Sequence, residues 1–126
     1  DRLGQTAGSL TFTTTIALVP LLTVMLAIFA AFPYFSSFRG ALEQFPRALM
    51  AVADVSAYGA AKYTWGGWQT VPDGVQRYLD AGARHAALRA MGESYDKESG
   101  LLHLAQEAWN ILAALELAMR SDKLGI

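Results

Sequence analysis

The second half of the chain places polar side chains at helical spacing among otherwise apolar residues. Asp80 and Arg84 are four positions apart and therefore share one face of a helix. His103, Gln106 and Asn110 stand at i, i+3 and i+7 and share one face of a later helix. If these two helices pack with the polar faces together, a carboxylate, imidazoles and amides converge. The spacing therefore predicts a polar site between the two helices.

An acidic connector joins these helices and reads ESYDKESG from Glu93 to Gly100. Mg²⁺ takes oxygen ligands and is commonly bound between carboxylates and the phosphates of a substrate. We therefore expect Mg²⁺ as the cofactor. The residues expected to bind it or to position water are Asp80, Glu93, Asp96 and Glu98.

Each of these residues also has a simpler explanation. Asp80 with Arg84 is an ordinary i, i+4 ion pair, and acidic loops are usually solvated. A histidine such as His85 or His103 is more often a buried polar group or a surface residue than a ligand. Asn110 is harder to explain in this way, because a buried amide without partners costs about 1 to 3 kcal/mol.

Three helices must position these side chains. Periodic apolar residues predict them over about 47–63, 74–92 and 100–120, with Asp73 and Gln76 as a capping box and Ser99 as a later cap. The strongest apolar periodicity is that of the third helix: Leu101, Leu104, Ala105, Ala108, Ile111, Leu112 and Leu115. No alternating strand pattern occurs, so the predicted fold is all-α. Three helices of this size would bury more surface as a homo-oligomer.

The N-terminal part has a different composition, with no Asp, Glu, Lys or Arg between Leu3 and Phe38. Its apolar centre predicts one transmembrane helix over about 12–33, kinked at Pro20, since ~20 residues span the ~30 Å hydrocarbon layer of a bilayer. A cleaved signal peptide and a buried central helix of a soluble domain are the alternatives. The composition shift divides the chain into a membrane segment, 1–38, and a helical domain, 39–126.

Charge and cysteine content exclude some functions. The net charge is −1 and no basic run occurs, so nucleic acid is not an expected partner. The chain has no cysteine, which rules out disulfides and thiolate metal sites within it.

Residues 2–38 contain the run QTAGSLTFTTTIALVPLLTVMLAIFAAFP. This run resembles the first membrane segment of the YihY/BrkB family of bacterial inner-membrane proteins. The resemblance implies a lipid bilayer as partner and the bacterial inner membrane as location. Members of that family have several spans. Positive charges flanking a span favour the cytoplasmic side, and Arg39 and Arg47 follow the apolar run whereas only Arg2 precedes it. This charge pattern favours a cytoplasmic C-terminal part, whereas the family resemblance implies a cytoplasmic N-terminus. We expect the soluble C-terminal part to lie in the cytoplasm.

Residues 47–118 carry the pattern G-A-x-K-Y, a Trp, D-A-x-x-R-H, G-E-x-x-D-x-E-S-G-x-x-H-L and a later Asn. The positions are Gly59, Ala60, Lys62, Tyr63, Trp68, Asp80, Ala81, Arg84, His85, Gly92, Glu93, Asp96, Glu98, Ser99, Gly100, His103, Leu104 and Asn110. The pattern resembles the phage-borne dATP/dGTP diphosphohydrolase family. That family is similar to the all-α nucleotide pyrophosphatases such as MazG, and this similarity implies a three-helix, MazG-like bundle. This chain has Gln106 where many relatives have a second His, and it lacks the doubled E-x-x-E of MazG proteins.

The resemblance implies a deoxynucleoside triphosphate substrate and metal-assisted attack of water on the α-phosphorus, with pyrophosphate leaving. Expected roles follow from it. Catalytic residues are Glu93, Asp96, Glu98 and His103; substrate-binding residues are Lys62, Trp68, Arg84, His85 and Asn110; metal-binding residues are Asp80, Glu93, Asp96 and Glu98. Trp65 or Trp68 would stack on a base, or plug the helix ends.

Two other interpretations stay open. In the first, the chain is a non-enzymatic small inner-membrane protein whose soluble helices bind a partner or oligomerise. In the second, two unrelated segments have been joined between Ser36 and Pro46. Pyrophosphate release from dGTP or dATP separates the enzyme from the first interpretation.

Overall fold

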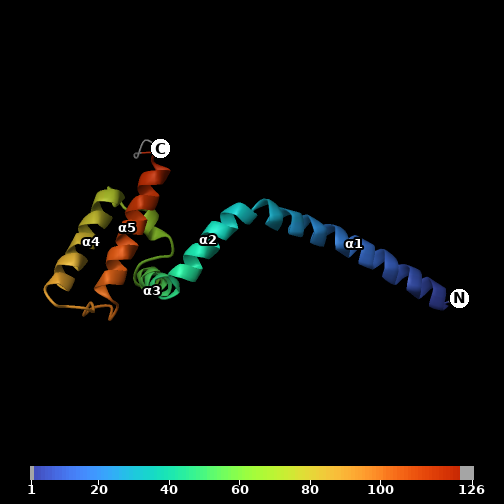
Figure 1. Cartoon of the computed structure of the whole chain (residues 1–126), viewed down its shortest axis with the longest axis horizontal. Coiled ribbons are helices and arrows are strands. Elements are labelled where there is room, and N and C mark those ends of the chain that lie inside the picture. The colour runs from blue at the N-terminus through green and yellow to red at the C-terminus, as the bar shows by residue number, and fades with distance from the viewer. Residues whose placement is uncertain (1, 123–126) are drawn as a thin grey trace. The chain divides into compact units, whose positions relative to one another are not determined.

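The computed structural model describes residues 2–122, with side chains from Thr14 onward. The described residues form five α-helices and one short 3₁₀ helix, and they contain no strand, only an isolated bridge between Tyr95 and Leu102. The prediction of an all-α fold is confirmed. The chain separates into two compact units, Asp1–Gln44 and Phe45–Ile126 (Figure 1).

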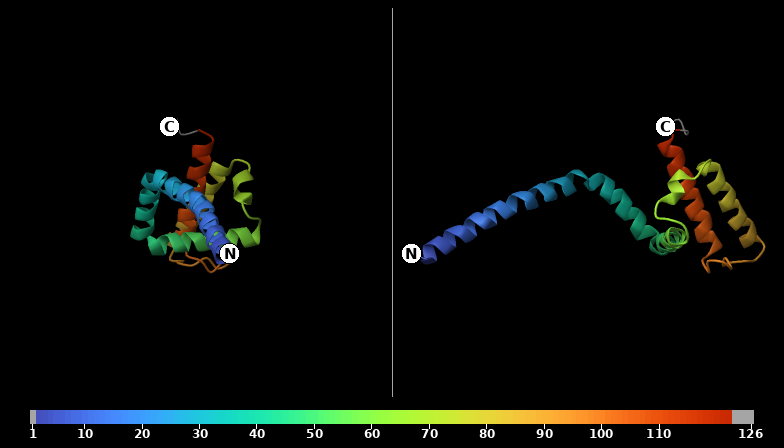
Figure 2. Two further views of the ribbon diagram at one scale, coloured as in Figure 1. Left: turned by 90° about the vertical axis from the view of Figure 1, so that its right-hand side faces the viewer. Right: turned by 180° about the vertical axis from the view of Figure 1, so that it is seen from behind.

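The N-terminal unit consists of α1 (Arg2–Ala30) and α2 (Phe32–Gln44), which meet at Ala31 (Figure 2). The predicted helix over about 12–33 coincides with α1 as far as Ala30, and Pro20 lies inside it, but the helix does not continue to residue 33 because it breaks at Ala31. Pro33 is the second residue of α2, and proline lacks the N–H that would bond to the preceding turn. From Thr14 on, the two helices are bent by 66°.

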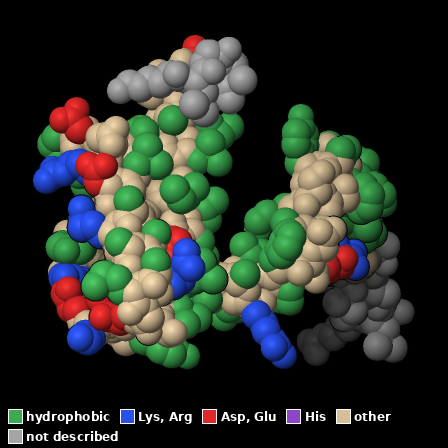
Figure 3. Space-filling view, turned by 60° about the vertical axis from the view of Figure 1, so that its left-hand side comes forward, with side chains coloured by type: hydrophobic (Ala, Val, Ile, Leu, Met, Phe, Trp, Pro, Cys, Tyr) green, Lys and Arg blue, Asp and Glu red, His purple; other side chains and the backbone are tan. Residues whose placement is uncertain are grey.

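No single helix within the described part meets the length and apolarity of a membrane span, but the bent pair Thr14–Ala30 and Phe32–Gln44 meets them together. Nearly every described side chain of this unit is exposed, including Leu22, Phe29 and Phe35. Figure 3 shows hydrophobic side chains over much of its visible face. The length and composition of the pair therefore give weak support for a membrane segment.

The C-terminal unit contains α3 (Pro46–Lys62), η1 (Gly67–Thr70), α4 (Gly74–Ala90) and α5 (His103–Arg120). The three predicted helices exist, with boundaries shifted by at most three residues. Asp73 holds the N-cap position of α4, as predicted, but the predicted capping box was wrong: Asp73 makes no side-chain cap bond, and Gln76 donates a hydrogen bond to Asp80 (2.9 Å) instead. Ser99 lies before a turn that delays α5 to His103, where Leu102 holds the cap position.

Helices α4 and α5 lie side by side and antiparallel in Figures 1 and 2, and α3 packs against α5. Small residues allow the close approach of α4 and α5. A Cβ built on Gly82 would lie 3.4 Å from the Cβ of Asn110, and Ala105, Ala113, Ala114 and Ala118 form the buried side of α5. The core of this unit is therefore built mainly from alanine and glycine.

The large apolar residues of α5 lie on the other side of the helix. Leu104 is 59% exposed and Leu115 is 47% exposed, although their spacing is the strongest apolar signal of this half. Leu104, Ile111 and Leu112 line an open groove of about 540 Å³. Its other wall includes Leu49 of α3 and Phe45, the residue just before α3. The apolar stripe of α5 is thus largely solvent-exposed in the single chain.

Candidate active site

The connector between α4 and α5 closes on itself and brings its acidic residues to the start of α5. The backbone N–H of Asp96 bonds to the carbonyl of Leu101 (2.8 Å), and that of His103 bonds to Ser94 (3.0 Å). Gly92 and Gly100 turn the chain with φ values of 97° and 72°, in the region that favours glycine. The side chains of Glu93 and Asp96 are both part-buried there.

His103 is the first residue of α5 and is 0% exposed. Its Nε2 lies 3.0 Å from Glu93 Oε1, and its Nδ1 lies 2.8 Å from Nδ1 of His85 on α4. An Nδ1–Nδ1 hydrogen bond requires one protonated and one unprotonated nitrogen. Burial, followed by the neighbouring His103 ring, lowers the pKa of His85 below its ordinary value. The two helices are thus joined by a chain from His85 through His103 to Glu93.

Asp96 is the second acid of the site. Its Oδ2 accepts hydrogen bonds from the Ser99 hydroxyl (2.8 Å), the Ser99 backbone N–H (3.2 Å) and Gln106 Nε2 (3.4 Å). Burial by itself raises the pKa of this carboxyl, but the bonds from Ser99 and Gln106 outweigh it and hold the pKa below its ordinary value. Asp96 is therefore ionised at neutral pH.

Glu93, Asp96 and His103 form a cluster that could hold a metal ion, because one ligand atom from each lies within 4.8 Å of the others. Two carboxylate oxygens and one imidazole nitrogen suit a divalent cation. The other two predicted metal-binding residues lie elsewhere. Asp80 is exposed and bonded to Gln76, and Glu98 is exposed and paired with Lys62 at the end of α3.

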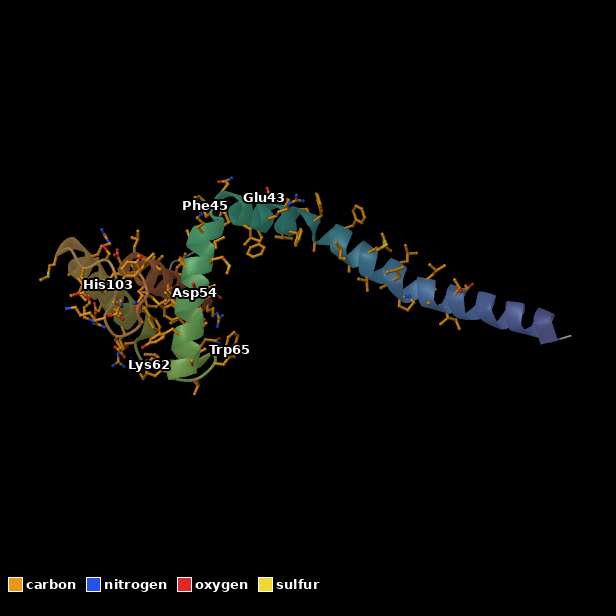
Figure 4. The ribbon with its side chains drawn as sticks, turned by 90° about the horizontal axis from the view of Figure 1, so that it is seen from below. Glu43, Phe45, Asp54, Lys62, Trp65 and His103 are labelled. Atoms are coloured by element: carbon orange, nitrogen blue, oxygen red, sulfur yellow. The ribbon has the colours of Figure 1, made fainter. Side chains whose placement is uncertain are left out.

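A cleft of about 940 Å³ opens between α3, the η1 segment, α4 and α5. Its lining includes Lys62, Arg84, His85, Asp96 and Glu98. The hydrogen bond to Glu98 raises the pKa of Lys62 above its ordinary value. Figure 4 shows Lys62 and Trp65 near the C-terminal end of α3. The lining of the cleft therefore combines cations with the acids Asp96 and Glu98.

Aromatic residues also line the cleft. Trp68, Tyr78 and Trp109 meet edge to face, with ring centroids 5.6 to 6.5 Å apart. Tyr78 donates to the carbonyl of Trp68 (2.8 Å), and Trp109 Nε1 donates to Ser56 Oγ (2.6 Å). The cluster holds η1 against the three helices. The sequence analysis did not select Tyr78 or Trp109 as site residues. The only sequence feature that pointed to them was the presence of aromatic residues within the predicted helices.

The remaining predicted residues divide between the cleft and the surface. Asn110 is buried, lines the cleft, and donates to the carbonyl of Gln106 in its own helix (2.8 Å). Trp65 also lines the cleft but is 89% exposed, whereas Trp68 is half-buried in the aromatic cluster. The predicted substrate-binding residues thus all line this cleft. They are Lys62, Trp68, Arg84, His85 and Asn110.

Residues 38–125 match the family described as dATP/dGTP diphosphohydrolase, N-terminal. The chain belongs to this family. The N-terminal segment is also similar to UPF0761 membrane proteins, which are proteins of the YihY/BrkB family. The resemblance to both families that the sequence indicated is therefore confirmed.

Among these relatives, the protein from Methylibium petroleiphilum is 76% identical over 45 residues, 36% of this chain and 11% of the relative. The protein from a Janthinobacterium species is 62% identical over 45 residues, 36% of this chain and 10% of the relative. The chain thus spans about a tenth of the length of these curated relatives. No solved structure matches it.

Proposed function

We propose that the C-terminal unit hydrolyses the purine deoxynucleoside triphosphates dATP and dGTP to monophosphate and pyrophosphate in a Mg²⁺-dependent reaction. One observation carries this proposal: Asp96 belongs both to the candidate metal cluster and to the wall of the cleft. A cation held beside Glu93 and Asp96 would therefore face a substrate in the cleft. Membership of the diphosphohydrolase family supports the reaction type.

The charged and the aromatic residues of the cleft suit the two ends of a nucleotide. The triphosphate would lie near Lys62 and Arg84, since both are cations and an arginine can form two parallel bonds to phosphate oxygens. The base would lie toward the aromatic cluster of Trp68, Tyr78 and Trp109. A volume of about 940 Å³ is within the range of small-molecule sites, about 300 to 1,000 Å³.

The reaction would join a water oxygen to the α-phosphorus and break the bond from that phosphorus to the oxygen that bridges the α- and β-phosphates. The electron pair leaves with pyrophosphate. Glu93 and Asp96 are the carboxylates that orient the water and take its proton, and His103 Nε2 lies 3.0 Å from the Glu93 carboxylate. When bound, Mg²⁺ supplies neutralisation of the charge that develops on the phosphate oxygens.

The test uses the full chain purified in detergent, incubated with dGTP or dATP and Mg²⁺, with pyrophosphate as the measured product. Asp96→Asn is expected to abolish release, because it removes the charge while keeping the shape. Glu116→Gln is the matched control, since Glu116 is an exposed acid bonded to Arg120 on the same helix. Equal release from Asp96→Asn and the parent chain would refute the assignment.

We propose further that the N-terminal unit anchors the chain in the bacterial inner membrane, with the C-terminal unit in the cytoplasm, where deoxynucleotides are present. Similarity to membrane proteins and the apolar bent pair support the anchor. Because the chain has no cysteine, Asp122→Cys introduces a single thiol. A membrane-impermeant maleimide should label it in inverted vesicles and not in intact spheroplasts, and the reverse pattern would place this unit outside.

The alternative is a membrane protein whose C-terminal helices bind a partner or a second copy of the chain. The exposed apolar groove between α3 and α5 favours it. The absence of pyrophosphate release, together with a dimer that Leu112→Glu dissociates, would support this alternative.

A further inference from the structure

We propose that Glu93, Asp96 and His103 bind a divalent first-row transition ion in preference to Mg²⁺, with His103 as the nitrogen ligand and His85 as its positioning residue. This inference rests on the proposed hydrolase having its cation at this cluster. It states which class of cation the cluster binds more tightly and the role of each imidazole.

The donor set points away from an all-oxygen ion. His103 is completely buried at the start of α5, and its Nε2 is directed at Glu93 (3.0 Å) within the three-residue cluster. Mg²⁺ requires oxygen ligands in near-ideal octahedral geometry and gives up its waters reluctantly. Imidazole nitrogen favours transition ions, whose affinity rises from Mn²⁺ towards Cu²⁺. One nitrogen and two carboxylates therefore form a mixed site that discriminates between the two classes.

The second imidazole completes the arrangement. A His103 Nε2 that binds a cation cannot carry a proton, so the ring proton must be on Nδ1. That Nδ1 lies 2.8 Å from His85 Nδ1, which is then the acceptor. Histidine ligands commonly donate their other ring N–H to an acceptor such as a carboxylate, a backbone carbonyl or water, and loss of that partner typically weakens metal binding about 10- to 100-fold. His85 therefore holds His103 in the tautomer and orientation needed for binding.

The bonds around Asp96 fix the third ligand. Ser99 and Gln106 hold one of its oxygens, so the carboxylate cannot rotate freely. Gln106 is one turn after His103 on α5, and its amide also bonds to Ser99 Oγ (3.0 Å). The connector and the first turn of α5 thus preorganise the acid and the imidazole together.

The experiment measures metal binding rather than turnover. Metal-free full chain in detergent is titrated with Mn²⁺, and free Mn²⁺ is followed by its EPR signal, with Mg²⁺ as competitor. We expect one Mn²⁺ per chain, bound about tenfold or more tightly than Mg²⁺. Pulsed EPR should show nitrogen modulation from a directly bound imidazole, which requires no variant.

Variants then assign the ligands. His103→Gln should remove the nitrogen modulation, and His85→Gln should weaken Mn²⁺ binding about tenfold while keeping the modulation. Glu116→Gln should change neither, and circular dichroism checks that each variant folds. Mn²⁺ bound without nitrogen modulation, or no more tightly than Mg²⁺, would overturn the inference. Nitrogen-coupled Mn²⁺ without pyrophosphate release would instead refute only the proposed hydrolysis.

Discussion

The contact between α4 and α5 at Gly82 makes a quantitative prediction. A Cβ at this position would lie 3.4 Å from Asn110 Cβ, 3.8 Å from the Glu107 carbonyl and 3.9 Å from Ile111 Cδ1. One methyl group therefore fits at ordinary contact distance, and alanine gains about 0.8 to 1.0 kcal/mol of helix propensity over glycine. Gly82→Ala should leave the free energy of unfolding unchanged or raise it by up to about 1 kcal/mol.

Gly82→Val should behave differently. Its two further methyl groups must enter space already bounded at contact distance, and overpacking of this kind costs about 1 to 3 kcal/mol. Valine should therefore be less stable than alanine by about 1 to 3 kcal/mol. It should also reduce pyrophosphate release, because it displaces Asn110 from the wall of the cleft.

Urea unfolding followed by tryptophan fluorescence measures this difference. All three tryptophans, Trp65, Trp68 and Trp109, belong to the C-terminal unit, so the signal reports on that unit. If Gly82→Val and Gly82→Ala unfold at the same urea concentration with the same slope, α4 and α5 do not approach as closely as described.

Three further predictions concern single contacts. Trp109→Phe keeps an aromatic ring, smaller than the indole, but loses the hydrogen bond to Ser56, which contributes about 0.5 to 1.5 kcal/mol of the loss expected in urea unfolding; in a Ser56→Ala background the same change should cost less, and an equal cost would contradict the bond. The hydrogen bond from Arg89 lowers the pKa of Glu107, so this ion pair stabilises the fold at pH values above the ordinary glutamate pKa, and the stabilisation is lost as the pH falls through the lowered pKa. Glu107→Gln should therefore be less stable than the parent chain at pH 7, and the difference in stability should disappear below about pH 4. Arg84→Gln should raise the KM for dGTP more than it lowers kcat, and an unchanged KM would remove Arg84 from phosphate binding.

The positions of the three C-terminal helices could be predicted from apolar periodicity and from the breakers between them. The cap hydrogen bonds could not be predicted, because the side chains of Ser99 and Gln76 bond to other residues in the folded chain. Ser99 bonds to Asp96 and Gln76 bonds to Asp80. Local side-chain bonds of this kind depend on a turn whose geometry the sequence pattern does not specify.

The packing face of α5 was the largest departure from the sequence pattern. Periodicity identifies the stripe of Leu104, Ile111 and Leu115 as the apolar side, yet the buried side carries alanines with His103 and Asn110. Close helix packing needs small residues, and hydrophobic spacing does not distinguish a surface that meets α4 from one that stays exposed.

The candidate site was predictable in composition but not in grouping. Glu93 and Asp96 are close in sequence, and they lie together with His103 in the structure. The contact between His85 on α4 and His103 on α5 depends on how each helix is rotated about its own axis. Residue spacing in the sequence does not determine that rotation. Asp80 and Glu98 carry the right chemistry but lie with other partners.

The central claim is that this cleft and its acidic connector hydrolyse deoxynucleoside triphosphates, and pyrophosphate release tests it most directly. The full chain with dGTP, dATP and Mg²⁺ or Mn²⁺ should release one pyrophosphate for each deoxynucleoside monophosphate formed, and Asp96→Asn should release none. Absence of pyrophosphate from the folded parent chain with either metal, or release of inorganic phosphate in its place, would contradict the account.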